Sequence, residues 1–192
     1  METRCIASWS ANPPPRWIRR HQLGLKEVAR IETEQLSIAK KLGFADLKTF
    51  RASLKTNPKL IPTSRDQLVE AYKGYIAQMQ PELPKLFGLL PKAPVEVRPM
   101  QAFREKEAAG ADYLQGTPDG SRPGVVYVNT SDYQNRTLTT VESTAYHEGV
   151  PEHHMQISIA QTLPDLPIFR QQAGYIAYVE GWALYAERLA KT

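Results

Sequence analysis

The order of the hydrophobic patterns along the chain constrains its fold more than any other feature. Between positions 21 and 90, apolar residues recur at the three- and four-residue spacing of amphipathic helices, and Gly43 is placed to end the first of them. Between 95 and 130 the pattern becomes β-branched and aromatic, most strongly at 125–129. Residues 139–192 return to helical spacing. Helices, a small sheet and further helices predict an α+β fold that is predominantly α-helical.

Residues 1–20 follow neither pattern. They contain Pro13-Pro14-Pro15 and lack the apolar core of roughly 7–15 residues that a signal peptide needs. We therefore expect an unstructured or aberrant leader over 1–20 and one domain over 21–192. With no targeting signal recognised, the sequence indicates no cellular location.

Composition excludes several classes of protein. The single cysteine, Cys5, cannot form an internal disulfide. No apolar run approaches the roughly 18 residues of a membrane span. The net charge of +4 comes from 24 basic and 20 acidic residues mixed along the chain, so we expect no nucleic-acid partner.

The residues that suggest chemistry gather in the last quarter of the chain. Three of the four histidines, His147, His153 and His154, lie within eight residues, and Glu148 directly follows the first. On a helix, a His-Glu pair is half of the usual zinc-protease arrangement, in which the histidine binds metal and the glutamate faces the attacking water. Threonine and serine residues at 139–143 predict the start of that helix.

The second histidine does not stand at the usual spacing. Four residues after His147 comes Pro151, and His153 and His154 follow at six and seven residues. Seven residues of continuous helix rise about 10.5 Å, too far for two rings to share one ion through Zn–N bonds of about 2.0–2.1 Å. Metal binding therefore requires the helix to bulge or break, for which Pro151 is suited. Spacing alone leaves a capped, solvent-facing histidine cluster equally open.

A third ligand is available downstream. Glu180 follows His147 by 33 residues and shares one face of a predicted helix with Glu187. A catalytic zinc site takes three protein ligands and leaves one position for water, so Glu180 could complete the set from a second, antiparallel helix. The alternative is that both glutamates are surface carboxylates of an amphipathic helix.

Two segments together carry a resemblance to a known family. The runs HEGVPEHHMQ at 147–156 and YVEGWALYAE at 178–187 resemble the bacterial family of domain of unknown function 885, whose members are similar to metallopeptidases of the carboxypeptidase Taq and oligopeptidase type. The similarity extends from about residue 21 to the end. The resemblance implies a zincin-like metallopeptidase fold, a divalent metal expected to be Zn²⁺, and hydrolysis of a peptide substrate.

The resemblance also implies roles for individual residues. His147 would be the first metal ligand, Glu180 the third, and Glu148 the general base that takes a proton from water. The second ligand would be His153 or His154. His153 is favoured because related peptidases place a glycine directly before their second histidine, and the family has glycine at the position of Glu152.

Substrate-binding residues follow from the same comparison. The strand 125–129 is placed like the edge strand that pairs with the substrate backbone in such enzymes, which assigns Tyr127 and Asn129 to substrate binding. Tyr185, within the second motif, is assigned there as well. An ordinary sheet strand is an equally good interpretation of 125–129.

The chain departs from the family pattern in three ways. Glu152 replaces glycine, and a left-handed backbone there would cost roughly 1–3 kcal/mol. Residues before 21 do not resemble the family, and its members are about three times longer, so the chain looks like a central fragment. This leaves an alternative: an inactive, truncated helical fragment that folds poorly or associates through uncovered apolar faces. The residues expected on those faces are Ile157, Ile159, Ile168, Phe169, Tyr175 and Trp182.

Overall fold

The computed structural model describes residues 16–172 and 174–190. They form two compact units divided between Ser53 and Leu54. The first contains α2 (Arg16–Lys41) and most of α3 (Leu47–Thr56). The chain is therefore already helical at Arg16, five residues before the predicted start of order, and the rest of the predicted leader lies outside the described residues.

The first unit shows clear helix-boundary signals. Gly43 has a φ of +88°, and its neighbour Phe44 donates its backbone N–H to Ala39 O at 2.9 Å, so the predicted glycine stop for the first helix is confirmed. Asp46 Oδ1 accepts a hydrogen bond from the backbone N–H of Thr49 at 2.8 Å, which satisfies a free amide at the start of α3.

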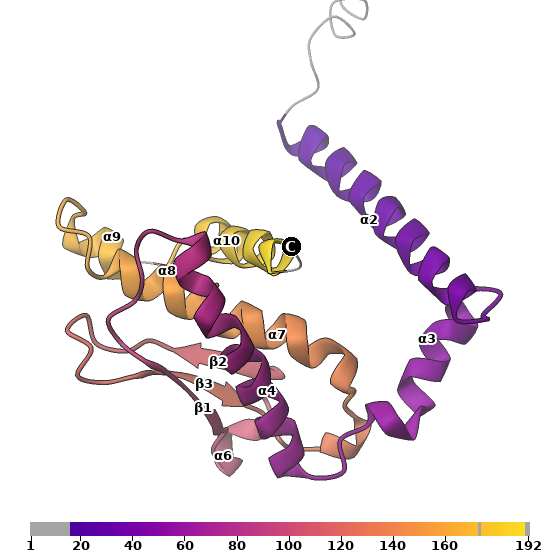
Figure 1. The fold of residues 1–192 in the computed structure, drawn as a ribbon. Coiled ribbons are helices and arrows are strands. Elements are labelled where there is room, and N and C mark those ends of the chain that lie inside the picture. The colour runs from indigo at the N-terminus through magenta and orange to yellow at the C-terminus, as the bar shows by residue number, and fades with distance from the viewer. Residues whose placement is uncertain (1–15, 173, 191–192) are drawn as a thin grey trace, which may run out of the picture. The chain divides into compact units, whose positions relative to one another are not determined.

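The second unit contains the sheet and the remaining helices, drawn in Figure 1. Its α-helices and strands are, in chain order, α4 (Arg65–Met79), α5 (Leu83–Leu86), β1 (Val95–Pro99), α6 (Ala102–Glu105), β2 (Ala111–Leu114), β3 (Gly124–Val128), α7 (Val141–Glu148), α8 (His153–Ala160), α9 (Ile168–Gln172) and α10 (Ile176–Leu189). Its short 3₁₀ turns are η1 (Pro58–Leu60), η2 (Gln80–Glu82), η3 (Tyr133–Asn135) and η4 (Leu138–Thr140). The described chain is thus a mostly helical α+β protein with one small sheet, as the pattern predicts.

The sheet has three strands in the order β1-β3-β2, with β1 parallel and β2 antiparallel to β3. Val126 lies opposite Val97 on one side and opposite Tyr113 on the other. The expectation that 125–129 forms an edge strand is therefore wrong. All five residues of β3 are buried, and a strand apolar on both faces suits the centre of a sheet, where neighbouring strands pair with both of its edges.

The core lies between one face of the sheet and helices α4 and α7 (Figure 1). Val126 and Val128 point to this face and pack with Tyr72, Ile76 and Ala145. The alternate residues Val125 and Tyr127 pack with Met100 on the opposite face, as the two-residue period of a strand requires.

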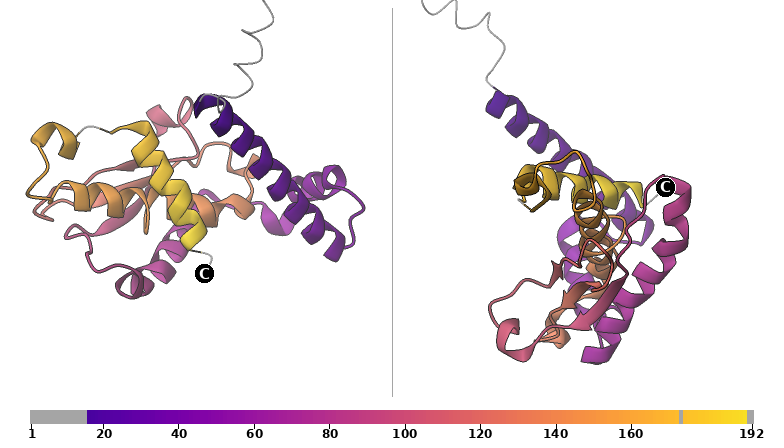
Figure 2. Two further views of the ribbon diagram at one scale, coloured as in Figure 1. Left: turned by 90° about the horizontal axis from the view of Figure 1, so that it is seen from above. Right: turned by 90° about the vertical axis from the view of Figure 1, so that its left-hand side faces the viewer.

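Helix α10 packs on α7 and α8, and the view from above in Figure 2 shows it crossing them. Of the six residues predicted on uncovered apolar faces, Ile168, Phe169 and Tyr175 are exposed, and the other three are partly buried. Trp182 is one of the latter, and its indole N–H donates to Pro151 O at 3.2 Å. Within the described ranges, no helix combines the length and apolar character needed to cross a membrane.

Candidate metal centre

The predicted helix break occurs between the two histidine positions. Helix α7 ends at Glu148 and α8 begins at His153, separated by a loop with a cis Val150–Pro151 bond. Gly149 permits this turn, because a Cβ atom there would lie 2.7 Å from both Ala145 O and the Ile76 side chain. The break brings the rings of His147 and His153 to a centroid separation of 4.6 Å.

Three side chains converge at this break from α7, α8 and α10. Glu180 Oε2 lies 3.2 Å from His147 Nε2, and Glu180 Oε1 lies 3.8 Å from His153 Nε2. One ligand atom of each residue lies within 4.8 Å of the others, so these three side chains could hold a metal ion. Two imidazoles and a carboxylate form one of the donor sets of catalytic zinc sites.

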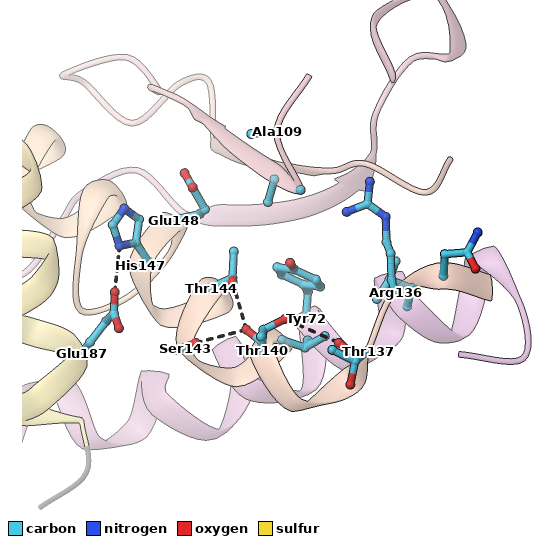
Figure 3. Close-up of a pocket in the computed structure, with 15 residues that line it drawn as sticks. Tyr72, Ala109, Arg136, Thr137, Thr140, Ser143, Thr144, His147, Glu148 and Glu187 are labelled. Carbon is cyan, nitrogen blue, oxygen red and sulfur yellow. Dashed lines mark hydrogen bonds and ion pairs between the residues drawn. The ribbon is translucent and has the colours of Figure 1, made fainter. Parts of the chain in front are cut away.

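The other ring nitrogen of His147 faces two further carboxyl groups. Its Nδ1 lies 3.0 Å from Glu187 Oε1, an interaction drawn in Figure 3, and 3.5 Å from Glu152 Oε2. When Nδ1–H donates to Glu187, the lone pair of Nε2 is directed toward Glu180 and His153. In that tautomer, the contact with Glu187 would fix the orientation of the His147 ring. The sequence marked Glu187 only by its position seven residues after Glu180, on the same helix face.

Glu152 lies inside this cluster. Its side chain is fully buried, and neither carboxylate oxygen has a hydrogen-bond partner among the described residues. Burial, followed by the charges of Glu187, Glu148 and Glu180, raises its pKa to about 9. Its φ is −105°, so the expected left-handed strain is absent. From the sequence, Glu152 was expected only to strain the loop in place of the family glycine, whereas the structure places its carboxyl group beside His147.

His154 occupies a different environment from His153. Its Nε2 lies 3.1 Å from Ala93 O, which can only accept a hydrogen bond, so Nε2 carries the proton and Nδ1 accepts from Tyr113 OH at 3.0 Å. Burial lowers the pKa of His154 to about 4, which keeps the ring neutral. Both nitrogens are engaged, and the geometry therefore favours His153 over His154 as a ligand.

Glu148 points into a pocket of about 500 Å³ that is also lined by His147 and Glu187 (Figure 3). Burial raises the pKa of Glu148 to about 7, and the charge of His147 partly opposes this effect. A carboxyl group with this pKa can both take up and release a proton near neutral pH.

The three predicted substrate-binding residues do not line this pocket. Tyr127 projects from the opposite face of the sheet, with the Arg104 guanidinium 5.5 Å from its ring centre. Asn129 is buried and donates to the carbonyls of Glu105, Ala108 and Ala109. Tyr185 is 58% exposed, and its ring contacts Trp182.

The strand that borders the pocket is β2. Ala109, Gly110 and Ala111, at its start, line the pocket, and β2 pairs with β3 alone among the described strands. Other pocket residues that the sequence did not identify are Tyr72, Arg136, Thr140 and Thr144. No sequence signal marked them as pocket residues, because they come from separate segments that only folding brings together.

Comparisons with known proteins show a similar fold in a solved structure. A crystal structure described as "the putative lipoprotein from Colwellia psychrerythraea" is 32% identical to this chain and superposes on it with a TM-score of 0.82. The match covers 91% of this chain and 31% of that one, so the chain spans about a third of its length. Among curated proteins, none matches the chain.

The family match covers nearly the whole sequence. Residues 18–192 match the family described as "Bacterial protein of unknown function (DUF885)". The matched region starts three residues before position 21, where the resemblance was expected to begin. The chain therefore belongs to the DUF885 family.

Proposed function

We propose that the chain carries the metal centre of a zinc-dependent peptide-bond hydrolase with a zincin-like fold. The observation that supports it is the convergence of His147, His153 and Glu180 within 4.8 Å, beside a pocket-lining glutamate. The donor set suits Zn²⁺, since two neutral imidazoles and a carboxylate are one of the ligand sets that catalytic zinc sites use. Burial lowers the pKa of His153, which favours its neutral, metal-binding form.

In this proposal, His147, His153 and Glu180 would hold the ion, which supplies the Lewis acidity that makes a water molecule a good nucleophile at neutral pH. Glu148 accepts the proton of that water and later delivers it to the leaving amine. Its pKa of about 7 suits both transfers. Glu187 keeps the His147 ring in place through Nδ1.

The substrate backbone would lie along the free edge of β2, in place of the strand favoured by the sequence. The start of this strand borders the pocket that contains Glu148. An extended peptide can add to an exposed strand edge through main-chain hydrogen bonds. Exchange of backbone amide protons at 111–114 should slow when a peptide binds there.

Metal content tests the proposal directly. We expect purified chain to bind one equivalent of zinc by elemental analysis, and His147→Ala or His153→Ala to abolish that binding. The exposed His21→Ala is the matched control and should retain it. Full zinc retention by His147→Ala would refute the site.

A second candidate is a chain without hydrolytic activity that associates through apolar surfaces. The exposed side chains of Ile168, Ile176 and Leu184 on α9 and α10 favour it. Oligomers without stoichiometric zinc in light scattering and elemental analysis would support this candidate over the hydrolase.

A further inference from the structure

The pocket beside Glu148 contains a cation that the hydrolytic proposal does not use. Figure 3 shows Glu148 and Arg136 at opposite ends of the pocket, with Tyr72 and Thr144 between them. Arg136 immediately follows η3, and Glu148 closes α7.

Among the described residues, the Arg136 side chain makes one hydrogen bond, from its Nε to Ser131 O at 3.1 Å. In the part of the chain that the structure describes, no carboxylate lies within ion-pair distance of its guanidinium. The nearby Glu105 lies close enough to feel the charge of Arg136, but its carboxylate accepts from Thr130 and pairs with Arg65 at 3.5 Å. The Arg136 guanidinium is therefore partly buried at one end of the pocket, and its N–H donors have no carboxylate partner among the described residues.

The wall of the pocket also includes the start of α7. Thr140 and Val141 line it there, and the Thr140 hydroxyl donates to Thr137 O at 3.4 Å and does not cap the helix. The partial positive charge of a helix N-terminus favours a nearby negative group. The guanidinium adds a full charge and a planar geometry that matches a carboxylate bidentately.

We propose that this pocket binds peptides that carry a carboxylate, with the carboxylate held by Arg136 and the scissile bond beside Glu148. The 8 residues of α7 rise about 12 Å, which corresponds to roughly three to four residues of extended peptide at about 3.3 Å each. The carboxylate is either the C-terminus of the peptide or an acidic side chain. Cleavage of the bound peptide rests on the proposed function, but binding of its carboxylate does not require hydrolysis.

The experiment measures binding of three probes to metal-free chain, so that no ion competes for the carboxylate. The probes are N-acetyl-trialanine with a free C-terminus, its C-terminal amide, and N-acetyl-Ala-Glu-Ala-amide, titrated to millimolar concentration with NMR detection. We expect the free acid to bind at least tenfold more tightly than its amide. A higher affinity of the glutamate-containing amide than of the free acid would assign the site to an acidic side chain.

Variants connect the preference to Arg136. Arg136→Gln should remove the difference between acid and amide, whereas Arg136→Lys, which retains the charge without the fork, should keep part of it. Arg122→Gln removes an exposed arginine outside the pocket and should leave the preference intact. Thermal unfolding of each variant shows whether a loss of binding reflects a loss of folding.

Several results would overturn the inference. Equal affinity of the acid and both amides, no binding of any probe, or an undiminished preference in Arg136→Gln would each do so. Zinc analysis is independent of these titrations, so failure of the metal centre and failure of the carboxylate site can be told apart.

Discussion

Replacing His154 by alanine tests whether His154 stabilises the fold while its neighbour His153 binds metal. The imidazole is 2% exposed and bridges Ala93 O and Tyr113 OH, on β2, at 3.1 and 3.0 Å. Truncation leaves the carbonyl and the hydroxyl without this partner, and a buried unsatisfied group costs about 1–3 kcal/mol. Tyr113 is partly exposed and can recover a bond to water, so we expect the free energy of unfolding to fall by about 3 kcal/mol, including the cavity.

The assay is urea unfolding of metal-free protein followed by circular dichroism, with zinc content measured separately. His153→Ala is the matched comparison, because His153 Nδ1 is buried without a hydrogen-bond partner among the described residues. We expect His154→Ala to lower the free energy of unfolding more than His153→Ala does, and to keep zinc in its folded fraction. His153→Ala should lose zinc with the smaller loss of stability. Loss of zinc by His154→Ala at unchanged stability would refute the assignment of its two ring nitrogens.

Three further predictions concern the carboxyl groups of the site. Glu148→Gln should keep zinc but lower the rate of peptide hydrolysis by about 10²–10⁴-fold. Comparable rates for the variant and the unmodified protein would exclude Glu148 as the base. Glu187→Gln should weaken zinc binding about 10–100-fold, because a neutral amide oxygen replaces the carboxylate as the partner of His147 Nδ1. Glu142→Gln, an exposed change on the same helix as His147, should leave the zinc affinity unaltered. Because the folded-state pKa of Glu152 lies at about 9, above the ordinary 4.5, the folded metal-free chain holds this proton more tightly than the unfolded chain. The contribution of Glu152 to the free energy of unfolding should therefore decline as pH rises from about 4.5 toward 9. Glu152→Gln should remove this contribution from the pH dependence of the urea midpoint, and an identical pH profile in the variant would contradict the burial of this group.

The regular elements were predictable because their signals are local. The β-branched and aromatic pattern of 95–130 marked the region of the sheet, including most of Gly124–Val128, and Gly43 marked the end of the first helix. The boundary at Arg16 was missed because a leader with prolines and no clear period offers no start signal for a helix. Strand order was missed because pairing depends on neighbours distant in sequence, so the buried strand β3 was assigned to an edge instead of the centre.

The candidate site could likewise be predicted only in part from the sequence. The sequence by itself determined the family, the helical character around a small sheet, and the group His147, Glu148 and Glu180, because adjacent residues and motif spacing are local properties. It also required a break in the helix if His147 was to meet a second histidine, since a continuous helix separates it from His153 by about 9 Å and from His154 by about 10.5 Å along the axis.

Only the tertiary structure showed which residues lie close enough to complete the candidate site. It turned His153 toward His147 and engaged both nitrogens of His154 with Ala93 and Tyr113, contacts that span 61 and 41 residues of sequence. It also placed Glu152 inside the cluster and Arg136 at the far end of the pocket. The physical reason is that burial, ring orientation and charge pairing arise from packing between distant segments, for which the spacing of residues along the chain carries no signal.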